Sequence, residues 1–176
     1  AAQGRIDAFF LSGGQIDGGA NVNLVGKGDY PRSTPRFPGS FGSAYMYFMI
    51  PNVILFREEH SPRVLVEKVD FISAPGTSPP SLWRRGGPVA LVTGMARFSF
   101  DRHARRFRLE SVHPGNTVDD VTAATGFDFD RAPAVPTTPG PTPGMLALMR
   151  GPLAARIAET YPKFADRVFT DRMAAT

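Results

Sequence analysis

Apolar residues fall into short runs along the chain, separated by loops rich in glycine and proline. Runs of β-branched and aromatic residues at 6–11, 53–56 and 89–92 predict buried strands, because each is short and bounded by turn-forming residues. The segments 64–66 and 69–72 predict one more strand region before the last of these. Strands that alternate with helices along a chain indicate an α/β fold.

Two helices are predicted within this pattern. Ser43 can cap a short apolar helix over residues 44–48, which ends before Pro51. Thr117 caps a helix that runs to Thr125, and the acidic side chains of its first turn complement the helix dipole.

A basic stretch in the second half of the chain alternates apolar and charged side chains with a period of two. The apolar positions are Phe98, Phe100, Phe107 and Leu109. This alternation predicts a hairpin that turns at residues 101–105, with one buried face and one solvated face. Because the aromatic rings lie on the face opposite the arginines, they cannot stack bases that those arginines hold, and we expect no nucleic-acid partner.

Three regions are expected along the chain. They are an α/β domain over residues 1–130, a proline-rich linker over 131–143, and a C-terminal helical tail over 144–176. In the tail, the apolar pattern predicts amphipathic helices over 145–150 and 153–168, interrupted near Pro162. No internal repeat is present.

Composition excludes several kinds of chemistry. The chain has 176 residues, which suits one domain, and it has no cysteine, which excludes disulfides, thiolate nucleophiles and cysteine-based zinc sites. Its three histidines lie far apart without the spacing of a metal site, so no metal is expected. The net charge of +4 comes largely from arginine, which is suited to a bidentate grip on carboxylate or phosphate.

No segment has the pattern of a membrane span. The longest apolar run, residues 44–56, contains Pro51 and Asn52 and falls short of the about 20 apolar residues that a span needs. The first residues also lack the basic start and long apolar stretch of a secretory signal. We therefore expect no membrane association and a cytoplasmic location.

A glycine-rich loop follows the first predicted strand, over residues 12–23. Such a loop can cradle a phosphate, but neither the G-x-x-x-x-G-K-[ST] nor the G-x-G-x-x-G pattern is present, which disfavours a nucleotide site of either type. Asn21 and Asn23 are typical of turns, where they hydrogen-bond their own backbone. Gln15 is a poor turn former and a good hydrogen-bond donor, which makes it a candidate for binding an oxyanion.

A serine hydrolase is a second interpretation. Residues 38–42 differ by one residue from the G-x-S-x-G nucleophile elbow, and Ser40, Asp70 and His113 follow in a compatible order. An elbow requires a preceding strand, and a proline-rich loop precedes Ser40, which disfavours this interpretation.

A third interpretation is an acid–base catalyst at the end of a strand. Glu58, Glu59 and His60 follow a predicted strand. A solvated strand end beside Arg57 and Arg63 explains the same residues more simply.

Several short motifs follow one another along the chain. They are Gly13-Gly14-Gln15-Ile16-Asp17, Asn21-Val22-Asn23, Gly28-Asp29-Tyr30, Arg36-Phe37, Gly39-Ser40, Gly42, His60, Arg63, Lys68-Val69-Asp70-Phe71-Ile72-Ser73, Pro75-Gly76, Val92-Thr93, Phe100-Asp101, His113-Pro114-Gly115 and Ala124-Thr125-Gly126-Phe127. In this order they resemble the family I CoA-transferases, and specifically the B (β) subunit of the glutaconate CoA-transferase type. The resemblance covers residues 5–130, and the ordered set is more specific than any single motif.

The resemblance implies an open, Rossmann-like α/β fold of the NagB/RpiA type, here partial, with a β-hairpin and C-terminal helices. It also implies a ping-pong reaction in which a glutamate attacks an acyl-CoA thioester and passes CoA, as a glutamyl thioester, to an acceptor carboxylate. In the family that glutamate lies upstream of the Gly-Gly-Gln loop, so we expect this chain to lack the N-terminal segment that carries it. Glu58, Glu59 and Glu67 do not match the nucleophile, and no catalytic residue is assigned in this chain.

The resemblance further implies that this chain supplies the part of the site that binds the thioester oxyanion. The family's glycine loop would present backbone N–H groups to the thioester oxygen, and it stands here as Gly39, Ser40, Phe41 and Gly42, with Phe41 in place of a glycine. Gln15 would be the matching side-chain donor. Loop support would come from Gly13, Gly14, Asn21 and Asn23.

The partner implied is a CoA-transferase A (α) subunit, in an α2β2 or similar hetero-oligomer that binds acyl-CoA and carboxylate substrates. Coenzyme A is a substrate in this chemistry, and no cofactor is expected. Because Phe41 departs from the family pattern, the main alternative is a related hydrolase that acts on ring-opened acyl-CoA without a glutamyl nucleophile. More distant alternatives are the serine hydrolase and a non-catalytic scaffold subunit.

Overall fold

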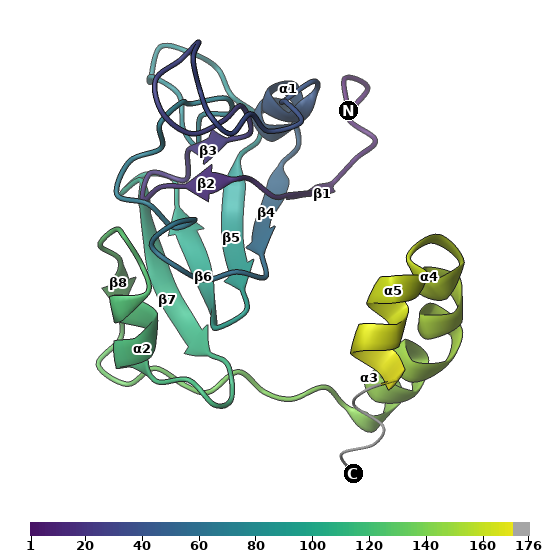
Figure 1. Cartoon of the computed structure of the whole chain (residues 1–176). Coiled ribbons are helices and arrows are strands. Elements are labelled where there is room, and N and C mark those ends of the chain that lie inside the picture. The colour runs from purple at the N-terminus through teal and green to yellow at the C-terminus, as the bar shows by residue number, and fades with distance from the viewer. Residues whose placement is uncertain (171–176) are drawn as a thin grey trace. The chain divides into compact units, whose positions relative to one another are not determined.

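The computed structural model describes residues 1–170 and divides into two units, Ala1–Thr138 and Pro139–Thr176. The first unit is built on a six-stranded sheet in the order β1-β4-β5-β6-β7-β8 (Figure 1). The strands are β1 (Ala8–Leu11), β4 (Asn52–Arg57), β5 (Pro88–Thr93), β6 (Ala96–Asp101), β7 (Arg106–Val112) and β8 (Asp130–Arg131). The first three in this order are parallel, β5-β6-β7 is antiparallel, and β8 pairs parallel to β7. The predicted α/β class is confirmed.

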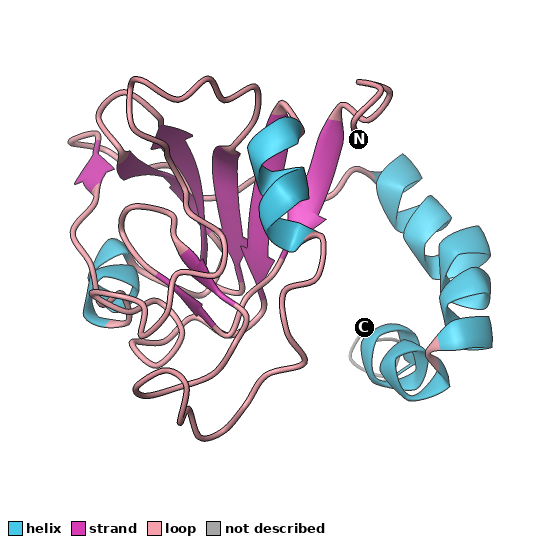
Figure 2. Cartoon of the chain, turned by 90° about the horizontal axis from the view of Figure 1, so that it is seen from above, coloured by secondary structure: helices cyan, strands magenta, loops and turns pink. Residues whose placement is uncertain are grey.

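One face of the sheet carries the hydrophobic core. Packed against it are the small hairpin of β2 (Gln15–Ile16) and β3 (Val22–Asn23), and the helices α1 (Ser43–Met49) and α2 (Val118–Ala123). Each of these elements contributes fully buried side chains, which are Ile16, Val22, Tyr47 and Val121. On the other face, Phe10 and Phe56 are 63% and 44% exposed, and their rings meet edge to face. Much of the unit is loop (Figure 2), as 18 glycines and 17 prolines suggest.

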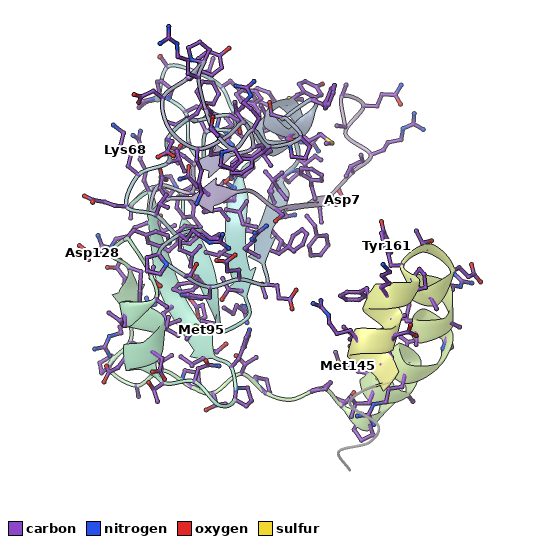
Figure 3. All side chains as sticks on the ribbon, viewed as in Figure 1. Asp7, Lys68, Met95, Asp128, Met145 and Tyr161 are labelled. Atoms are coloured by element: carbon purple, nitrogen blue, oxygen red, sulfur yellow. The ribbon has the colours of Figure 1, made fainter. Side chains whose placement is uncertain are left out.

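The predicted hairpin forms from β6 and β7. Phe98 pairs with Leu109 and Phe100 with Phe107 across the strands, and all four side chains are buried. Their arginine neighbours on the alternate positions face solvent, as with Arg97. Met95, in the turn before β6, lies at the lower end of the sheet in Figure 3, where β5 ends.

The two predicted helices differ in how they begin. At α2, Thr117 accepts from the N–H of Asp120, while the Asp120 carboxylate accepts from the N–H of Thr117, so the predicted cap is a full capping box. At α1, the predicted Ser43 cap is wrong. Gly42 is the N-cap without a side-chain hydrogen bond, because Ser43 is already helical and its N–H donates to the carbonyl of Ser40.

The strand region predicted over residues 64–72 is also wrong. Leu65 makes one isolated bridge to Ile16, and Ala74 makes one to Val22. Their partners β2 and β3 are only two residues long each, so no ladder can extend. The N–H of Asp70 instead donates to a side chain, Gln15.

The first unit extends to Thr138 because residues after β8 stay bonded to β7. The N–H of Val112 donates to the carbonyl of Pro136, and the N–H of Thr138 donates to the carbonyl of Val112.

The second unit is helical, with α3 (Pro143–Leu148), η1 (Met149–Leu153), α4 (Ala154–Thr160), α5 (Pro162–Ala165) and η2 (Asp166–Thr170). The helical run is interrupted at Tyr161, directly before Pro162, as predicted. In the part of the chain that the structure describes, no helix is long and apolar enough to cross a membrane.

Candidate functional site

Gln15, the first residue of β2, lies at the centre of a buried hydrogen-bond network. Its Nε2 donates to Asp70 Oδ2 (3.1 Å), and its Oε1 accepts from Asn23 Nδ2 (2.7 Å) and the N–H of Asp70 (3.1 Å). Asp70 Oδ2 also accepts from the N–H of Gly28 (2.8 Å). Gln15 is only 5% exposed and Asn23 is fully buried. The network fixes the β2–β3 hairpin to the loop that directly follows it, at Gly28, and to the loop that holds Asp70, which is distant in sequence.

Asn23 connects this network to the loop that ends at Gly39. Its Oδ1 accepts from the N–H groups of Val25 (2.9 Å) and Gly26 (3.3 Å), and its Nδ2 donates to the carbonyl of Gly26 (2.7 Å). The loop then returns along itself, and the N–H of Gly39 donates to the carbonyl of Leu24 (3.2 Å). A buried amide with all these partners holds one end of the loop rigidly.

Gly13 and Gly14 allow close approach of other segments. A Cβ at Gly13 would lie 2.4 Å from Val22 Cγ1, and one at Gly14 would lie 2.2 Å from Phe37 Cε2. Neither distance is possible for a real side chain, so both positions require glycine. The Phe37 ring therefore packs directly on the backbone before Gln15, which brings the start of β2 and the 24–39 loop together.

Asn21 supports the turn between β2 and β3. Asp17, which is 5% exposed, accepts from the N–H groups of Gly19 and Asn21 (3.0 Å each) and from Asn21 Nδ2 (3.1 Å). Asn21 Oδ1 in turn accepts from the N–H of Gly76 (3.1 Å). The turn is thus closed by its own side chains and attached to the loop after residue 72.

The loop from Gly39 to Gly42 leads into α1 and is open to solvent. Gly39 has φ +103°, a conformation that favours glycine, whereas Phe41 has no positive φ, so the phenylalanine is accommodated without backbone strain. Its side chain is 99% exposed. Among the described residues, nothing accepts a hydrogen bond from the N–H groups of Ser40, Phe41 and Gly42. The loop therefore offers free donors at the start of a helix.

His60, which follows β4, is held between two hydroxyl groups. Its Nδ1 lies 2.7 Å from Thr93 Oγ1 and its Nε2 lies 2.9 Å from Thr125 Oγ1. Burial lowers the pKa of His60 below its ordinary value. Its neighbour Glu59 binds Arg63 through both oxygens (3.0 and 2.7 Å), and these hydrogen bonds lower the pKa of Glu59 to about 2. Neither side chain has the free position of an acid–base catalyst.

The structure does not assemble the serine hydrolase residues. Asp70 accepts from Gln15 and Gly28, as described above, and His113 contacts Thr138 Oγ1 (2.8 Å) and the carbonyl of Thr93 (3.0 Å). Neither is hydrogen-bonded to Ser40. The Ser40–His113–Asp70 relay is therefore wrong, because its base and acid are committed to separate networks.

Sequence reasoning missed the role of Asp70 as the partner of Gln15, since the sequence indicates Asp70 only as a triad acid and as part of a family motif. A glutamine in an apolar segment and a carboxylate elsewhere could have suggested a buried hydrogen bond, but Gln15 and Asp70 are 55 residues apart and no local pattern links them. Sequence reasoning also missed Arg84, which lies over the Tyr47 ring at 5.1 Å and donates to the carbonyl of that residue (3.0 Å).

This fold and this arrangement of loops define a known class of protein. Residues 1–124 match the family described as Coenzyme A transferase, and the chain belongs to that family. The resemblance inferred from the motifs is thereby confirmed.

Two relatives within the family are named as the B components of CoA-transferases. That of glutaconate CoA-transferase from Acidaminococcus fermentans is 32% identical over 148 residues, which cover 80% of this chain and 54% of that protein. That of 3-oxoadipate CoA-transferase from Pseudomonas knackmussii is 31% identical over 164 residues, which cover 90% of this chain and 62% of that protein. The chain thus spans between half and two thirds of the curated relatives it matches.

Solved structures agree. The crystal structure of IpdAB from Rhodococcus jostii has a TM-score of 0.77 at 28% identity, over 85% of this chain and 61% of that one. That of glutaconate CoA-transferase from Acidaminococcus fermentans has a TM-score of 0.73 at 30% identity, over 82% and 57%. The decarboxylase AibA/AibB has a TM-score of 0.72 at 25% identity, over 84% and 57%.

Proposed function

We propose that this chain is part of a B-type component of a CoA-transferase, which moves CoA from an acyl-CoA thioester to a carboxylic acid. The observation that carries the proposal is the family match over residues 1–124, within which the Gly-Gly-Gln segment and the Gly39–Gly42 loop are joined through Asn23. The active protein would be a hetero-oligomer with an A-type subunit, located in the cytoplasm where acyl-CoA thioesters are available.

In this proposal, the loop before α1 stabilises negative charge on the thioester oxygen. The free N–H groups of Ser40, Phe41 and Gly42 are donors of the kind that oxyanion holes use. They have no competing acceptor to give up among the described residues, and one such donor typically supplies about 3 kcal/mol of transition-state stabilisation. A glutamate outside this chain's residues would act as the nucleophile and carry CoA as a glutamyl thioester.

Gln15 has a positioning role in this mechanism. One amide N–H and both lone-pair directions of its carbonyl are used by Asp70 and Asn23, and the side chain is 5% exposed. Its remaining N–H is the donor that the family resemblance assigns to the thioester, and that direct role stays a prediction. Its support of the loop through Asn23 follows from the hydrogen bonds themselves.

The test is to co-express the complete B-type chain with its A-type subunit and to measure the consumption of acyl-CoA with and without an acceptor carboxylate. A transferase consumes acyl-CoA only when an acceptor carboxylate is present, and the CoA stays in thioester form. Free thiol can be measured in parallel with Ellman's reagent. Loss of acyl-CoA without any acceptor, with equal release of free CoA, would contradict the transferase.

A thioester hydrolase is the second candidate, and Phe41 is the observation that favours it. This residue replaces a glycine of the family loop and is 99% exposed beside the free N–H groups. A similar fold at 25% identity is named a decarboxylase, so the fold hosts chemistry other than CoA transfer. Phe41→Gly restores the family loop. Release of free CoA by the native complex without any acceptor, together with a lower rate of that release in Phe41→Gly, would support the hydrolase for the native chain.

A further inference from the structure

Helix α1 continues directly from the Gly39–Gly42 loop, and it is too short to hold its own position. It has seven residues, Ser43–Met49, and an isolated helix of that length is marginal in water. Gly42, the last residue of the loop, is its N-cap. The direction of the free N–H groups in the loop therefore depends on the contacts that fix α1.

Residues 84–87, which lead into β5, cap the carboxyl end of α1 where β4 and β5 begin (Figure 1). Arg84 Nη2 donates to the carbonyl of Tyr47 (3.0 Å), and the N–H of Gly86 donates to that of Phe48 (2.7 Å). Both carbonyls belong to the last turn of the helix, where a carbonyl has no partner within the helix. The Arg84 guanidinium also lies 5.1 Å from the Tyr47 ring centre and 5.7 Å from that of Phe48. Its positive charge thus lies at the negative end of the helix dipole.

The same guanidinium reaches the loop after residue 72. Arg84 Nη1 donates to the carbonyl of Pro75 (2.8 Å) and Nε donates to that of Gly86 (2.8 Å), so each of its three nitrogen atoms has a backbone partner. Pro75 directly precedes Gly76, whose N–H donates to Asn21 Oδ1 in the turn between β2 and β3 (3.1 Å). Arg84 therefore links α1 to the β2–β3 hairpin through this loop.

Tyr47 makes a second link between α1 and the hairpin. Its side chain is fully buried, and its hydroxyl donates to the carbonyl of Ala20 in the β2–β3 turn (2.8 Å). Gly76 packs on the same turn so closely that a Cβ there would lie 2.7 Å from the Ala20 carbonyl oxygen. Because the Arg84 guanidinium covers the Tyr47 ring, it also holds the side chain that anchors the helix. The contacts of Arg84 and Tyr47 together fix α1 relative to the hairpin.

From these contacts we propose that Arg84 is a positioning residue for CoA transfer. It fixes α1, and through α1 the N–H groups of the Gly39–Gly42 loop, relative to the hairpin that carries Gln15. The inference rests on the proposed function, in which that loop stabilises the thioester oxygen. None of the Arg84 hydrogen bonds among the described residues is to the loop itself, so the residue acts through the position of the helix.

Arg102 provides a matched control in the same region. Like Arg84, it donates to three backbone carbonyls, which are those of Pro51, Gly87 and Pro88, and none of them belongs to α1. Arg84→Gln and Arg102→Gln therefore remove the same charge and the same kind of bond, but only the first releases the helix. Circular dichroism at the assay temperature verifies that both variants are folded.

Hydrogen–deuterium exchange of the 176-residue chain tests the effect on α1 without any reaction. In Arg84→Gln, the amides of residues 46–50 should exchange at least about tenfold faster than in the native chain, because the end of the helix loses its cap. In Arg102→Gln, the same amides should exchange within about twofold of the native rate.

Steady-state kinetics of the complete enzyme, with its A-type subunit, tests the effect on the reaction. Arg84→Gln should lower kcat at least about tenfold and change the KM for acyl-CoA less than about twofold, because misplaced donors weaken stabilisation of the transition state rather than binding of the substrate. Arg102→Gln should leave both constants within about twofold of the native values. If Arg84→Gln does not fold, Arg84→Lys takes its place, since it keeps the charge but not the planar fork and should lower kcat at least about threefold.

The inference is overturned if the Arg84 variant leaves the exchange of α1 at the native rate, or if it lowers kcat no more than Arg102→Gln does. Failure of the proposed function gives a different result. A native complex that transfers no CoA contradicts that function and, with it, the reaction that Arg84 is proposed to serve. A native complex that transfers CoA while the Arg84 variant keeps the native kcat overturns the positioning inference alone.

Discussion

Gln15→Ala tests the central network most directly. The substitution removes three side-chain hydrogen bonds, one donated to the Asp70 carboxylate and two accepted, from the N–H of Asp70 and from Asn23. Each such bond contributes about 1 kcal/mol net, more where a charge is involved, so the expected loss is roughly 2 to 4 kcal/mol. Asp70 and Asn23 keep other partners, at Gly28 and Gly26, which prevents a larger loss.

Thermal unfolding of the chain, followed by circular dichroism, measures this loss. For a chain of this length, roughly 2 to 4 kcal/mol corresponds to a fall in Tm of roughly 5 to 15 °C. Gln3→Ala is the matched control, because Gln3 is exposed and should leave Tm unchanged. In the complete enzyme, displacement of the loop should also lower turnover at least about tenfold. A Tm within about 1 °C of the native value, with unchanged turnover, would refute both the energetic and the positioning argument.

Three further predictions concern the surroundings of the network. Burial lowers the pKa of His60, so the folded chain binds a proton at this imidazole less readily than the unfolded chain, and stability should fall as pH drops below about 6.5. His60→Gln should flatten that fall in a series of Tm measurements against pH, and an unchanged slope would contradict the prediction. The pKa of Glu59 is lowered to about 2, so its contribution to folding stability is present above about pH 4.5 and is lost as pH falls toward 2. Because the Glu59–Arg63 ion pair lies at the surface, Glu59→Gln should lower the free energy of unfolding in urea at pH 7 by less than about 1 kcal/mol, and a larger loss would be inconsistent with a surface ion pair. Gly14→Ala forces its Cβ against Phe37 and should lower Tm, whereas Gly140→Ala has open space around it and should not. Equal Tm values for the two variants would contradict the tight packing of Phe37 on the backbone at Gly14.

Local patterns allowed much of the fold to be predicted. The β6–β7 hairpin follows from alternation within one stretch of sequence, and α2 follows from Thr117 and Asp120, which are three residues apart. In each case the determining contacts lie between close neighbours. The prediction over residues 64–72 was wrong for the opposite reason, because those residues make backbone and side-chain hydrogen bonds to β2, about fifty residues earlier.

The candidate site was predictable only in part. The glycine and asparagine positions near Gln15 follow from turn chemistry and from the family motifs. The joining of Gln15 to Asp70, and that of Arg84 to the end of α1, depend on how separate loops are packed. No local pattern encodes these pairings, since the residues concerned are common polar residues in ordinary loop positions.

The 55-residue separation between Gln15 and Asp70 has a consequence for the order of folding. Closing a long loop costs more entropy than closing a short one, and contacts distant in sequence form slowly. The β6–β7 hairpin, whose strands are joined by a short turn, needs no such closure and can form within microseconds. We therefore expect the aromatic hairpin to be structured early and the Gln15 network late. Substitutions at Gln15 should then act mainly on the unfolding rate, while those at Phe98 or Phe107 should also slow refolding.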